Sequence, residues 1–362
     1  MVRGLRVLRA TALPVLLLAV TGCASLGYYG HLARGQAALL RQRVPIAAVV
    51  DDARADPVLR ARLAEVLEAR AFAVSHLGLP DNASYTRYVA LDRPWVSWAV
   101  YAAREFSTQP ALRCFPVAGC VPYVGYFSPE RARAEAQRLR ARGLETWIGG
   151  VPAYSTLGWF ADPVFSSMLR GGQDELIEIV FHELAHQWLY VRDDTVFNES
   201  LASFVGRQGL VEWRRSRGEP EPDPARAERE RAFVTRVLAL REDLAALYAR
   251  PLDPATMRIL KAAHIADFRA WYAAQRAGPW RDERRFDAWA NAPIDNAALA
   301  PFGLYDRWVP AFEGVFEAVG QDWGRFRAAV EQVARMPPAV RSDYLDAWAA
   351  AMEGPPRDAV LR

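Results

Sequence analysis

Hydrophobic residues recur at helical spacing over residues 55–77, which predicts a helix. Three later segments are instead rich in aromatic and β-branched residues with partial alternation, and these predict strands. They cover residues 85–107, 123–127 and 144–150. A further helix is expected between the last two, because the segment from Ser128 to Gly143 begins with Ser-Pro and ends in glycine.

From about residue 199 onward almost the whole chain has a helical pattern, and another helix begins near Gln173. The segment GEPEPDP, residues 218–224, is expected to link two helices without forming a domain boundary. Long helices are predicted over 225–249 and 318–336. The chain therefore predicts an α+β fold, in which a small, mainly antiparallel sheet is followed by a predominantly helical half.

The N-terminus carries a different pattern. Arg3, Arg6 and Arg9 precede the apolar run TALPVLLLAV, which is too short to span a bilayer comfortably. This order predicts a secretory signal peptide over residues 1–22. The run ends in VTGC, which resembles the lipobox of bacterial lipoproteins, so we expect Cys23 to be lipidated and to become the mature N-terminus. A plain signal peptide, or an anchor helix with an incidental cysteine, is the alternative.

Lipidation of Cys23 implies a tether over residues 23–35, followed by one domain over 36–362. That domain has an α/β part to about residue 172 and a helical part over 173–362. Ala24 stands where an aspartate would favour retention at the inner membrane. We therefore expect an exported protein held at the outer membrane and facing the periplasm.

Composition and charge exclude one class of partner. The 362 residues are 52% hydrophobic and 24% charged, which is typical of globular proteins. The formal net charge is +3, and acidic and basic residues are interspersed without a basic stripe. We expect no nucleic-acid partner, and the pattern indicates no particular oligomeric state.

Cys114 and Cys120 lie in RCFPVAGCVPYVGYF, on either side of a Pro/Gly turn. In an oxidising compartment a disulfide that closes this loop is the favoured interpretation. A metal-binding pair is less favoured, because no other cysteine or histidine lies nearby in the sequence. Two free buried thiols remain the third interpretation.

The segment FHELAHQ places His182 and His186 four residues apart, with Glu183 beside the first. Residues at this spacing share one face of a helix, so both imidazoles can reach the same point. The H-E-x-x-H pattern is typical of zinc hydrolases, in which the ion polarises a carbonyl and the glutamate is the general base toward water. The alternative is a buried helix that carries two histidines without a metal.

A third ligand is needed, and FNESLASFVG supplies a candidate. Asn198 is a plausible N-cap of a second helix, and a polar turn between two antiparallel helices would bring Glu199 to the open side of both histidines. Two histidines, one glutamate and a water form a known catalytic zinc set.

The order of these motifs resembles that of the gluzincin metallopeptidases, which implies that Glu199 is the third ligand and that Ala202 allows close helix packing. Two departures from the family pattern stand out. The interval between His186 and Glu199 is short, and Ser203 occupies the position at which related enzymes carry an acidic residue that orients a histidine. Asp193 or Asp194, in the intervening loop, could take that orienting role.

Over about nine-tenths of its mature length the chain resembles the family of bacterial zinc aminopeptidase lipoproteins. The resemblance rests on these segments: TGC, SHLGLPDNASYTRYVALDRPWVSWAV, CFPVAGCVPYVGYF, YSTLGWFADPVFSSML, FHELAHQ, FNESLASFVG and DNAALAPFGLYDRWVPAF. It implies a peptidase that binds one Zn²⁺ ion and acts on peptides, with aminopeptidase action expected.

A zinc peptidase also needs a hydrogen-bond donor for the oxyanion. The resemblance implies Tyr305, and Tyr154 is the second candidate. The carboxylate that would bind a substrate α-amino group is undecided among six acidic residues: Asp162, Glu175, Glu178, Asp193, Asp194 and Asp295. The remaining histidines, His31, His76 and His264, are expected to be structural.

The favoured function is therefore a lipid-anchored zinc peptidase with Glu183 as general base. Two alternatives remain. One is a non-catalytic envelope lipoprotein that keeps its metal site for folding or for a partner. The other is a zinc hydrolase that acts on cell-wall cross-links.

Overall fold

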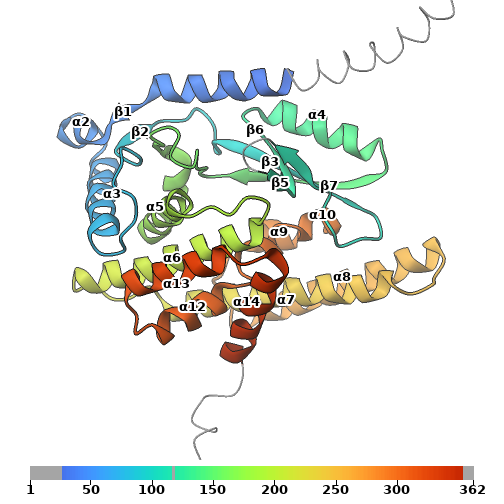
Figure 1. The fold of residues 1–362 in the computed structure, drawn as a ribbon. Coiled ribbons are helices and arrows are strands. Elements are labelled where there is room, and N and C mark those ends of the chain that lie inside the picture. Colours follow the sequence, from blue (N-terminus) through green and yellow to red (C-terminus); the bar gives the residue numbers. More distant parts are fainter. Residues whose placement is uncertain (1–26, 116–118, 354–362) are drawn as a thin grey trace, which may run out of the picture.

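The computed structural model describes residues 27–115 and 119–353, so the predicted signal peptide and Cys23 lie outside the described residues. The fold is α+β, as the hydrophobic pattern predicts (Figure 1). No helix in the described part of the chain is both long and apolar enough to cross a bilayer.

The main sheet has three antiparallel strands in the order β6-β3-β7. They are β3 (Ser97–Arg104), β6 (Tyr123–Tyr126) and β7 (Leu144–Val151). Val100 pairs with Val124 on one side and with Ile148 on the other. Because side chains alternate along a strand, this register gives the sheet two distinct faces.

One face of this sheet packs against helix α4 (Pro129–Arg140). Val100, Ala102 and Val124 contact the buried Ala132 and Ala136 of that helix. The opposite face carries Ala99, Tyr101 and Ala103, together with Tyr123 and Trp147. It packs on short helices near residue 300, whose buried members include Ala297 and Leu304.

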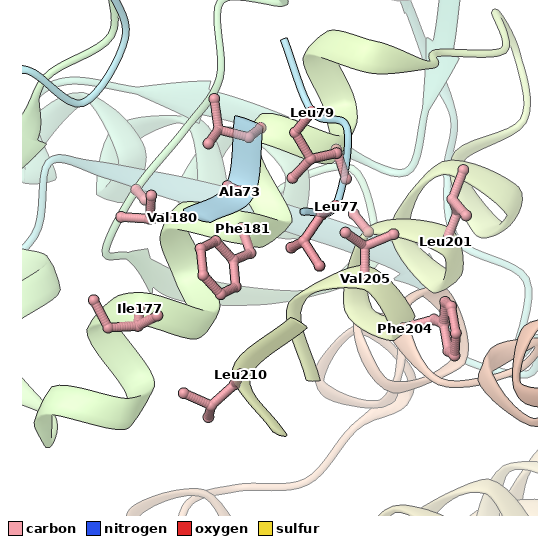
Figure 2. Packing of buried hydrophobic residues seen from close by; sticks show 14 of the residues in the cluster. Ala73, Leu77, Leu79, Ile177, Val180, Phe181, Leu201, Phe204, Val205 and Leu210 are labelled. Carbon is pink, nitrogen blue, oxygen red and sulfur yellow. The ribbon is translucent and has the colours of Figure 1, made fainter. Parts of the chain in front are cut away.

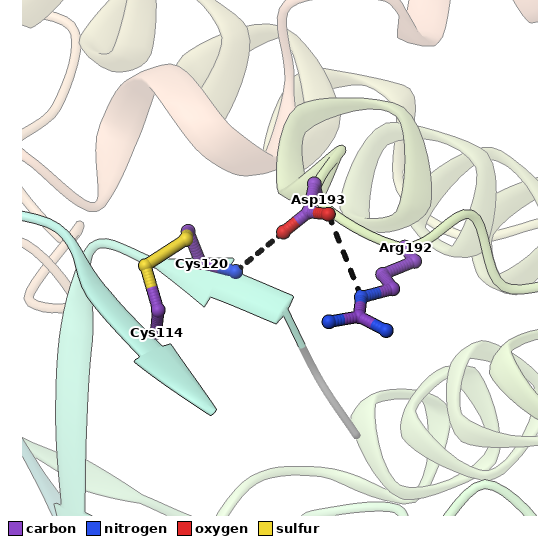
Figure 3. Close-up of a disulfide and its surroundings, with 4 residues drawn as sticks. All are labelled: Cys114, Cys120, Arg192 and Asp193. Atoms are coloured by element: carbon purple, nitrogen blue, oxygen red, sulfur yellow. Dashed lines mark hydrogen bonds and ion pairs between the residues drawn. A yellow bond between two sulfur atoms is a disulfide. The ribbon is translucent and has the colours of Figure 1, made fainter. Parts of the chain in front are cut away.

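A second set of strands is smaller and mixed, in the order β1-β2-β8. These strands are β1 (Val44–Pro45), β2 (Arg87–Val89) and β8 (Val164–Phe165), and β2 and β8 run parallel. A separate hairpin joins β4 (Arg113–Phe115) to β5 (Gly119–Val121), and a disulfide links Cys114 to Cys120 across it (Figure 3).

Helices make up most of the rest. Those of the N-terminal part, besides α4, are a helix over residues 27–42, α2 (Ile46–Asp51), α3 (Pro57–Ser75) and a 3₁₀ turn (Ser166–Arg170). The helical part contains α5 (Gln173–Trp188), α6 (Thr195–Ser216), α7 (Pro224–Tyr248), α8 (Pro254–Ala277), α9 (Asp287–Ala290), α10 (Asn296–Leu299), α11 (Phe302–Tyr305), α12 (Val309–Ala318), α13 (Trp323–Ala334) and α14 (Pro338–Glu353).

The largest hydrophobic core surrounds α5 and α6. Phe181 of α5 is fully buried among side chains from α3 and α6 (Figure 2). Gly209 of α6 lies against it, and an added Cβ atom there would approach Leu77 and the Phe181 ring to within 2.9 Å. Phe204 of α6 contacts aromatic side chains of α12 and α13. A separate core joins α7 to α8 around Phe233.

Three boundaries differ from those predicted. Helix α6 begins at Thr195, because Asp194 and not Asn198 is its N-cap and accepts a hydrogen bond from Phe197 N at 3.0 Å. The segment 318–336 contains the end of α12, a turn and α13, since Gln321 has a left-handed backbone. Residues 27–35, which the sequence predicts as tether, form the first part of a helix. Tyr28 and His31 of this helix form hydrogen bonds with the backbone of Gly125 and Phe127.

Candidate metal centre

Two antiparallel helices bring the histidines and Glu199 together. Helix α5 ends at Trp188, because Leu189 turns to an extended conformation, and α6 starts after a short loop. The helices approach closely at Gly206, where an added Cβ would lie 3.0 Å from the Glu178 carbonyl oxygen and 3.5 Å from His182 Cβ. Ala202, the small residue expected to allow this approach, is 1% exposed.

The side-chain atoms of His182, His186 and Glu199 converge on one point. The two Nε2 atoms are 3.1 Å apart, and Glu199 Oε2 lies 3.3 Å from His182 Nε2 and 3.5 Å from His186 Nε2. Among the described residues these three form the group that could hold a metal ion. The interval between His186 and Glu199, although short, is therefore long enough for the connection.

The charges within this group stabilise one another. Burial acts to raise the pKa of Glu199, but the neighbouring imidazoles outweigh it and lower the pKa to about 2. At His186 burial acts to lower the pKa, but the Glu199 carboxylate outweighs burial and the pKa is raised. At His182 burial dominates and lowers the pKa. Glu199 is thus the fixed negative charge of the centre.

Glu183 is next to His182 in the sequence but is not one of the three converging side chains. It is 8% exposed, and its Oε2 atom has no hydrogen-bond partner among the described residues. Burial raises the pKa of its carboxyl group to about 7. A buried carboxyl with a free oxygen, at the wall of the cleft that contains the histidines, is available for proton transfer.

Four tyrosines surround Glu199, and sequence reasoning identified only Tyr305. Burial, and after it the Glu199 carboxylate, raises the pKa of the Tyr101, Tyr123 and Tyr190 hydroxyls, and both also raise the pKa of Tyr305. At Tyr305 the Glu199 charge is the largest cause, ahead of burial. Its ring centroid is 6.2 Å from that of His182. A neutral phenol this close to the histidines can donate a hydrogen bond to a group bound at the centre.

Helix α6 itself positions the segment that carries Tyr305. Ser200, next to Glu199, accepts a hydrogen bond from Trp308 N at 3.2 Å. Seven residues further along, Arg207 binds Asp306 at 2.7 Å. Ser200 Oγ also donates to Leu304 O at 3.4 Å, so contacts from α6 hold the backbone on both sides of Tyr305 and keep the tyrosine in register with Glu199.

Tyr154 occupies a different part of the cleft. Its hydroxyl donates to the side-chain oxygen of Gln36, and its ring stacks on Phe165 with centroids 5.7 Å apart. The following loop folds around Asp162, which accepts hydrogen bonds from Thr156 N at 2.9 Å and Thr156 Oγ1 at 2.8 Å. Tyr154 therefore lines the cleft but directs its hydroxyl toward the N-terminal helix.

The loop between α5 and α6 is held by the three residues expected near the ligands. The Asn198 amide donates to Val191 O at 2.8 Å and accepts from Val191 N at 2.7 Å. Asp194 caps α6 and binds Arg341 at 2.7 Å, while Asp193 accepts from Cys120 N at 2.7 Å (Figure 3). His186 Nδ1 has no hydrogen-bond partner within the described ranges, so neither aspartate orients that ring.

The other acidic candidates differ in their surroundings. Asp295 caps α10 by accepting from Ala298 N at 2.9 Å. Glu175 and Glu178 line the cleft, and Glu178 stands one helical turn before His182. Burial raises the pKa of Glu178 to about 7, against the opposing charge of Arg207, whose Nε is 3.7 Å away. Glu178 is thus the acidic candidate that combines proximity to a histidine with access to the cleft.

The remaining histidines have structural contacts. His31 Nε2 accepts from Phe127 N at 3.1 Å, and His76 Nε2 pairs with Glu212 at 2.8 Å. His264 lies 4.0 Å from Asp243.

A cleft of about 2310 Å³ contains the centre. It extends from the N-terminal helix, past the sheet face with Tyr101 and Tyr123, to the charged side chains of α6 and α7. A cleft of this size is larger than a small-molecule pocket and can accommodate an extended polymer.

The family model described as "Putative aminopeptidase" matches residues 27–345. The chain belongs to this family. No curated protein and no solved structure matches it. The matched region includes the three converging side chains, Glu183 and all four tyrosines around Glu199.

Replacing Asn198 by leucine should loosen the α5–α6 loop. The change removes both hydrogen bonds to Val191 and leaves that residue's backbone groups unpaired, which costs about 1–3 kcal/mol for each group left buried. Urea unfolding should show a lower free energy of unfolding than for the wild type. An unchanged unfolding midpoint would mean that the amide clamp contributes nothing to the connection.

Proposed function

We propose that this protein is a zinc-dependent aminopeptidase of the gluzincin type. The observation that carries the proposal is the convergence of His182, His186 and Glu199 beside the free carboxyl group of Glu183. The family to which the chain belongs supports peptidase action. The extended cleft supports a peptide substrate.

The donor set and its spacing favour zinc. Zinc binds imidazole nitrogen and carboxylate oxygen at about 2.0–2.2 Å, so tetrahedral ligands around it lie about 3.3–3.5 Å apart. The three separations here are 3.1, 3.3 and 3.5 Å. Two imidazoles and one carboxylate would leave the fourth position for water or substrate, as catalytic zinc sites require.

A bound zinc ion would polarise the scissile carbonyl group and lower the pKa of water at the site. Glu183 would accept a proton from the attacking water and pass it to the leaving amine. Its unpaired Oε2 and its position beside His182 suit this role, because proton transfer needs a carboxyl group that no other partner occupies.

Tyr305 would donate a hydrogen bond to the oxyanion as the carbonyl carbon becomes tetrahedral. The negative charge of Glu199 keeps the phenol protonated, and contacts from Ser200 and Arg207 hold its backbone segment. A fixed donor is effective here because it needs no reorganisation when charge develops. Glu178, one turn before His182, is our candidate for binding the substrate α-amino group.

Substitution of Glu183 by glutamine should separate catalysis from metal binding. The variant should retain one zinc ion per chain by elemental analysis but lose about 10²–10⁴-fold in kcat on free-amine peptides. By contrast, Glu199→Ala should weaken zinc affinity by more than about 100-fold, because a direct ligand is lost. Glu242→Gln, on the exposed side of α7, is the matched control for both.

Loss of zinc from Glu183→Gln would show that Glu183 is a ligand. Unaltered zinc affinity in Glu199→Ala would remove Glu199 from the metal site. If the zinc-loaded wild type leaves every free-amine peptide intact, the proposed peptidase function is wrong.

The two tyrosine candidates can be compared directly. Tyr305→Phe should lower kcat by about 10²–10³-fold with little change in zinc content, since one oxyanion donor is lost. Tyr154→Phe should have the smaller effect, because its hydroxyl binds Gln36. Steady-state kinetics that rank the two variants the other way would move the donor role to Tyr154.

We also propose that the mature protein is a lipoprotein anchored through Cys23 at the outer membrane. The support is the VTGC sequence after a short apolar run. Cys23→Ser should abolish incorporation of labelled palmitate and move the protein out of the membrane fraction. Membrane association that persists in this variant would indicate an uncleaved anchor helix instead.

A further inference from the structure

We infer that the N-terminal helix, residues 27–42, closes one end of the cleft and confines cleavage to the end of a peptide chain. The inference rests on the proposed peptidase function and adds a physical basis for its restriction to chain ends. Residues 27–35 belong to the predicted tether, yet the helix that contains them packs against the sheet beside β6 and α4 (Figure 1).

One face of this helix lines the cleft over four successive turns. Tyr28, Leu32, Gln36 and Leu40 recur at intervals of four residues, and all of them border the same cleft as His182. The helix is therefore a wall of the cleft along its whole length.

Contacts along the helix hold this wall in place. At its C-terminal end the Arg43 guanidinium donates to Ala161 O at 2.7 Å. Gln36 accepts from the Tyr154 hydroxyl. Next to Gln36, Gly35 packs so closely on Phe127 that an added Cβ would overlap the ring. The helix thus lies across the end of the sheet, where β6 finishes at Tyr126.

The helix also occupies the open edge of β6. Tyr28 donates its hydroxyl hydrogen to Gly125 O at 3.1 Å, and His31 Nε2 accepts from Phe127 N at 3.1 Å. Strand β6 is at the edge of its sheet, and such an edge can bind an extended peptide through backbone hydrogen bonds. At Gly125 and Phe127 these backbone groups are already taken.

Outward-facing backbone groups recur at every second residue of an antiparallel edge strand, so the next such position is Tyr123. Tyr123 borders the same cleft as Glu199, and it packs on the same hydrophobic cluster as Tyr305. A peptide that pairs with the edge at Tyr123 would meet the side chains of the helix about two residues, or ~7 Å, further on. A chain end fits in that space, whereas a continuing chain does not.

Displacing the helix in the full mature chain tests the inference. Gly35→Leu should push the helix away from Phe127, and Gly30→Leu is the matched control, since an added Cβ at Gly30 meets only Arg34 Nη2, at 3.7 Å. The substrates are two ten-residue peptides of the same sequence, one with a free and one with an acetylated N-terminus. Mass spectrometry follows cleavage by zinc-loaded protein.

The wild type and Gly30→Leu should trim the free peptide from its N-terminus and leave the acetylated peptide intact. Gly35→Leu should cleave internal bonds of the acetylated peptide at least tenfold faster than the wild type. A second variant, Tyr28→Phe with His31→Ala, frees the edge of β6 without added bulk and should change the pattern in the same direction. Zinc content and thermal unfolding show whether each variant is folded.

Internal cleavage of the acetylated peptide by the wild type overturns the inference and the restriction to aminopeptidase action, while zinc-dependent peptidase action stands. The inference is also overturned if a variant that is folded and zinc-loaded, either Gly35→Leu or Tyr28→Phe with His31→Ala, cleaves the two peptides as the wild type does. Absence of hydrolysis of both peptides by the wild type overturns the proposed function, and the inference with it.

Discussion

The close antiparallel packing of α5 and α6 is the constraint on which the site depends. His182 and His186 face α6, and Glu199 reaches them only because Ala202 and Gly206 leave room for the helices to approach. A larger side chain at Gly206 would press on the Glu178 carbonyl, which cannot move without disturbing α5. The Phe181 cluster, in which α5 packs against α3 and α6, fixes the position of the same helix.

The rest of the chain completes the site around this pair. In the disulfide-linked hairpin, Cys120 N donates a hydrogen bond to Asp193, and Arg341 of α14 binds Asp194. Both contacts hold the loop that precedes α6. The sheet brings tyrosines to Glu199, and the segment after α10 brings Tyr305. Elements far apart in sequence therefore converge on one carboxylate, whose charge the two imidazoles balance.

Helical periodicity was sufficient to predict that His182 and His186 share a face, and the asparagine and glutamate after the loop pointed to Glu199. The α6 boundary was misplaced because Asp194 and Asn198 are both good N-caps, and only the clamp between Asn198 and Val191 decides between them. Tyr101 and Tyr123 were missed for a different reason. Which face of a strand meets the site depends on long-range pairing, here Tyr101 with Tyr123 and Trp147, which local patterns do not contain. The packing of residues 27–35 likewise depends on partners about a hundred residues away.

The most direct test of the account locates the metal itself. Crystals of the mature protein grown with zinc should give a single anomalous peak at the zinc absorption edge, about 2.0–2.2 Å from one nitrogen of each of His182 and His186 and from a Glu199 oxygen. Glu183 should stand outside that set of ligands, with its carboxyl group toward the fourth position. A zinc ion held by other residues, or a protein that hydrolyses peptides with this position empty, would contradict the account.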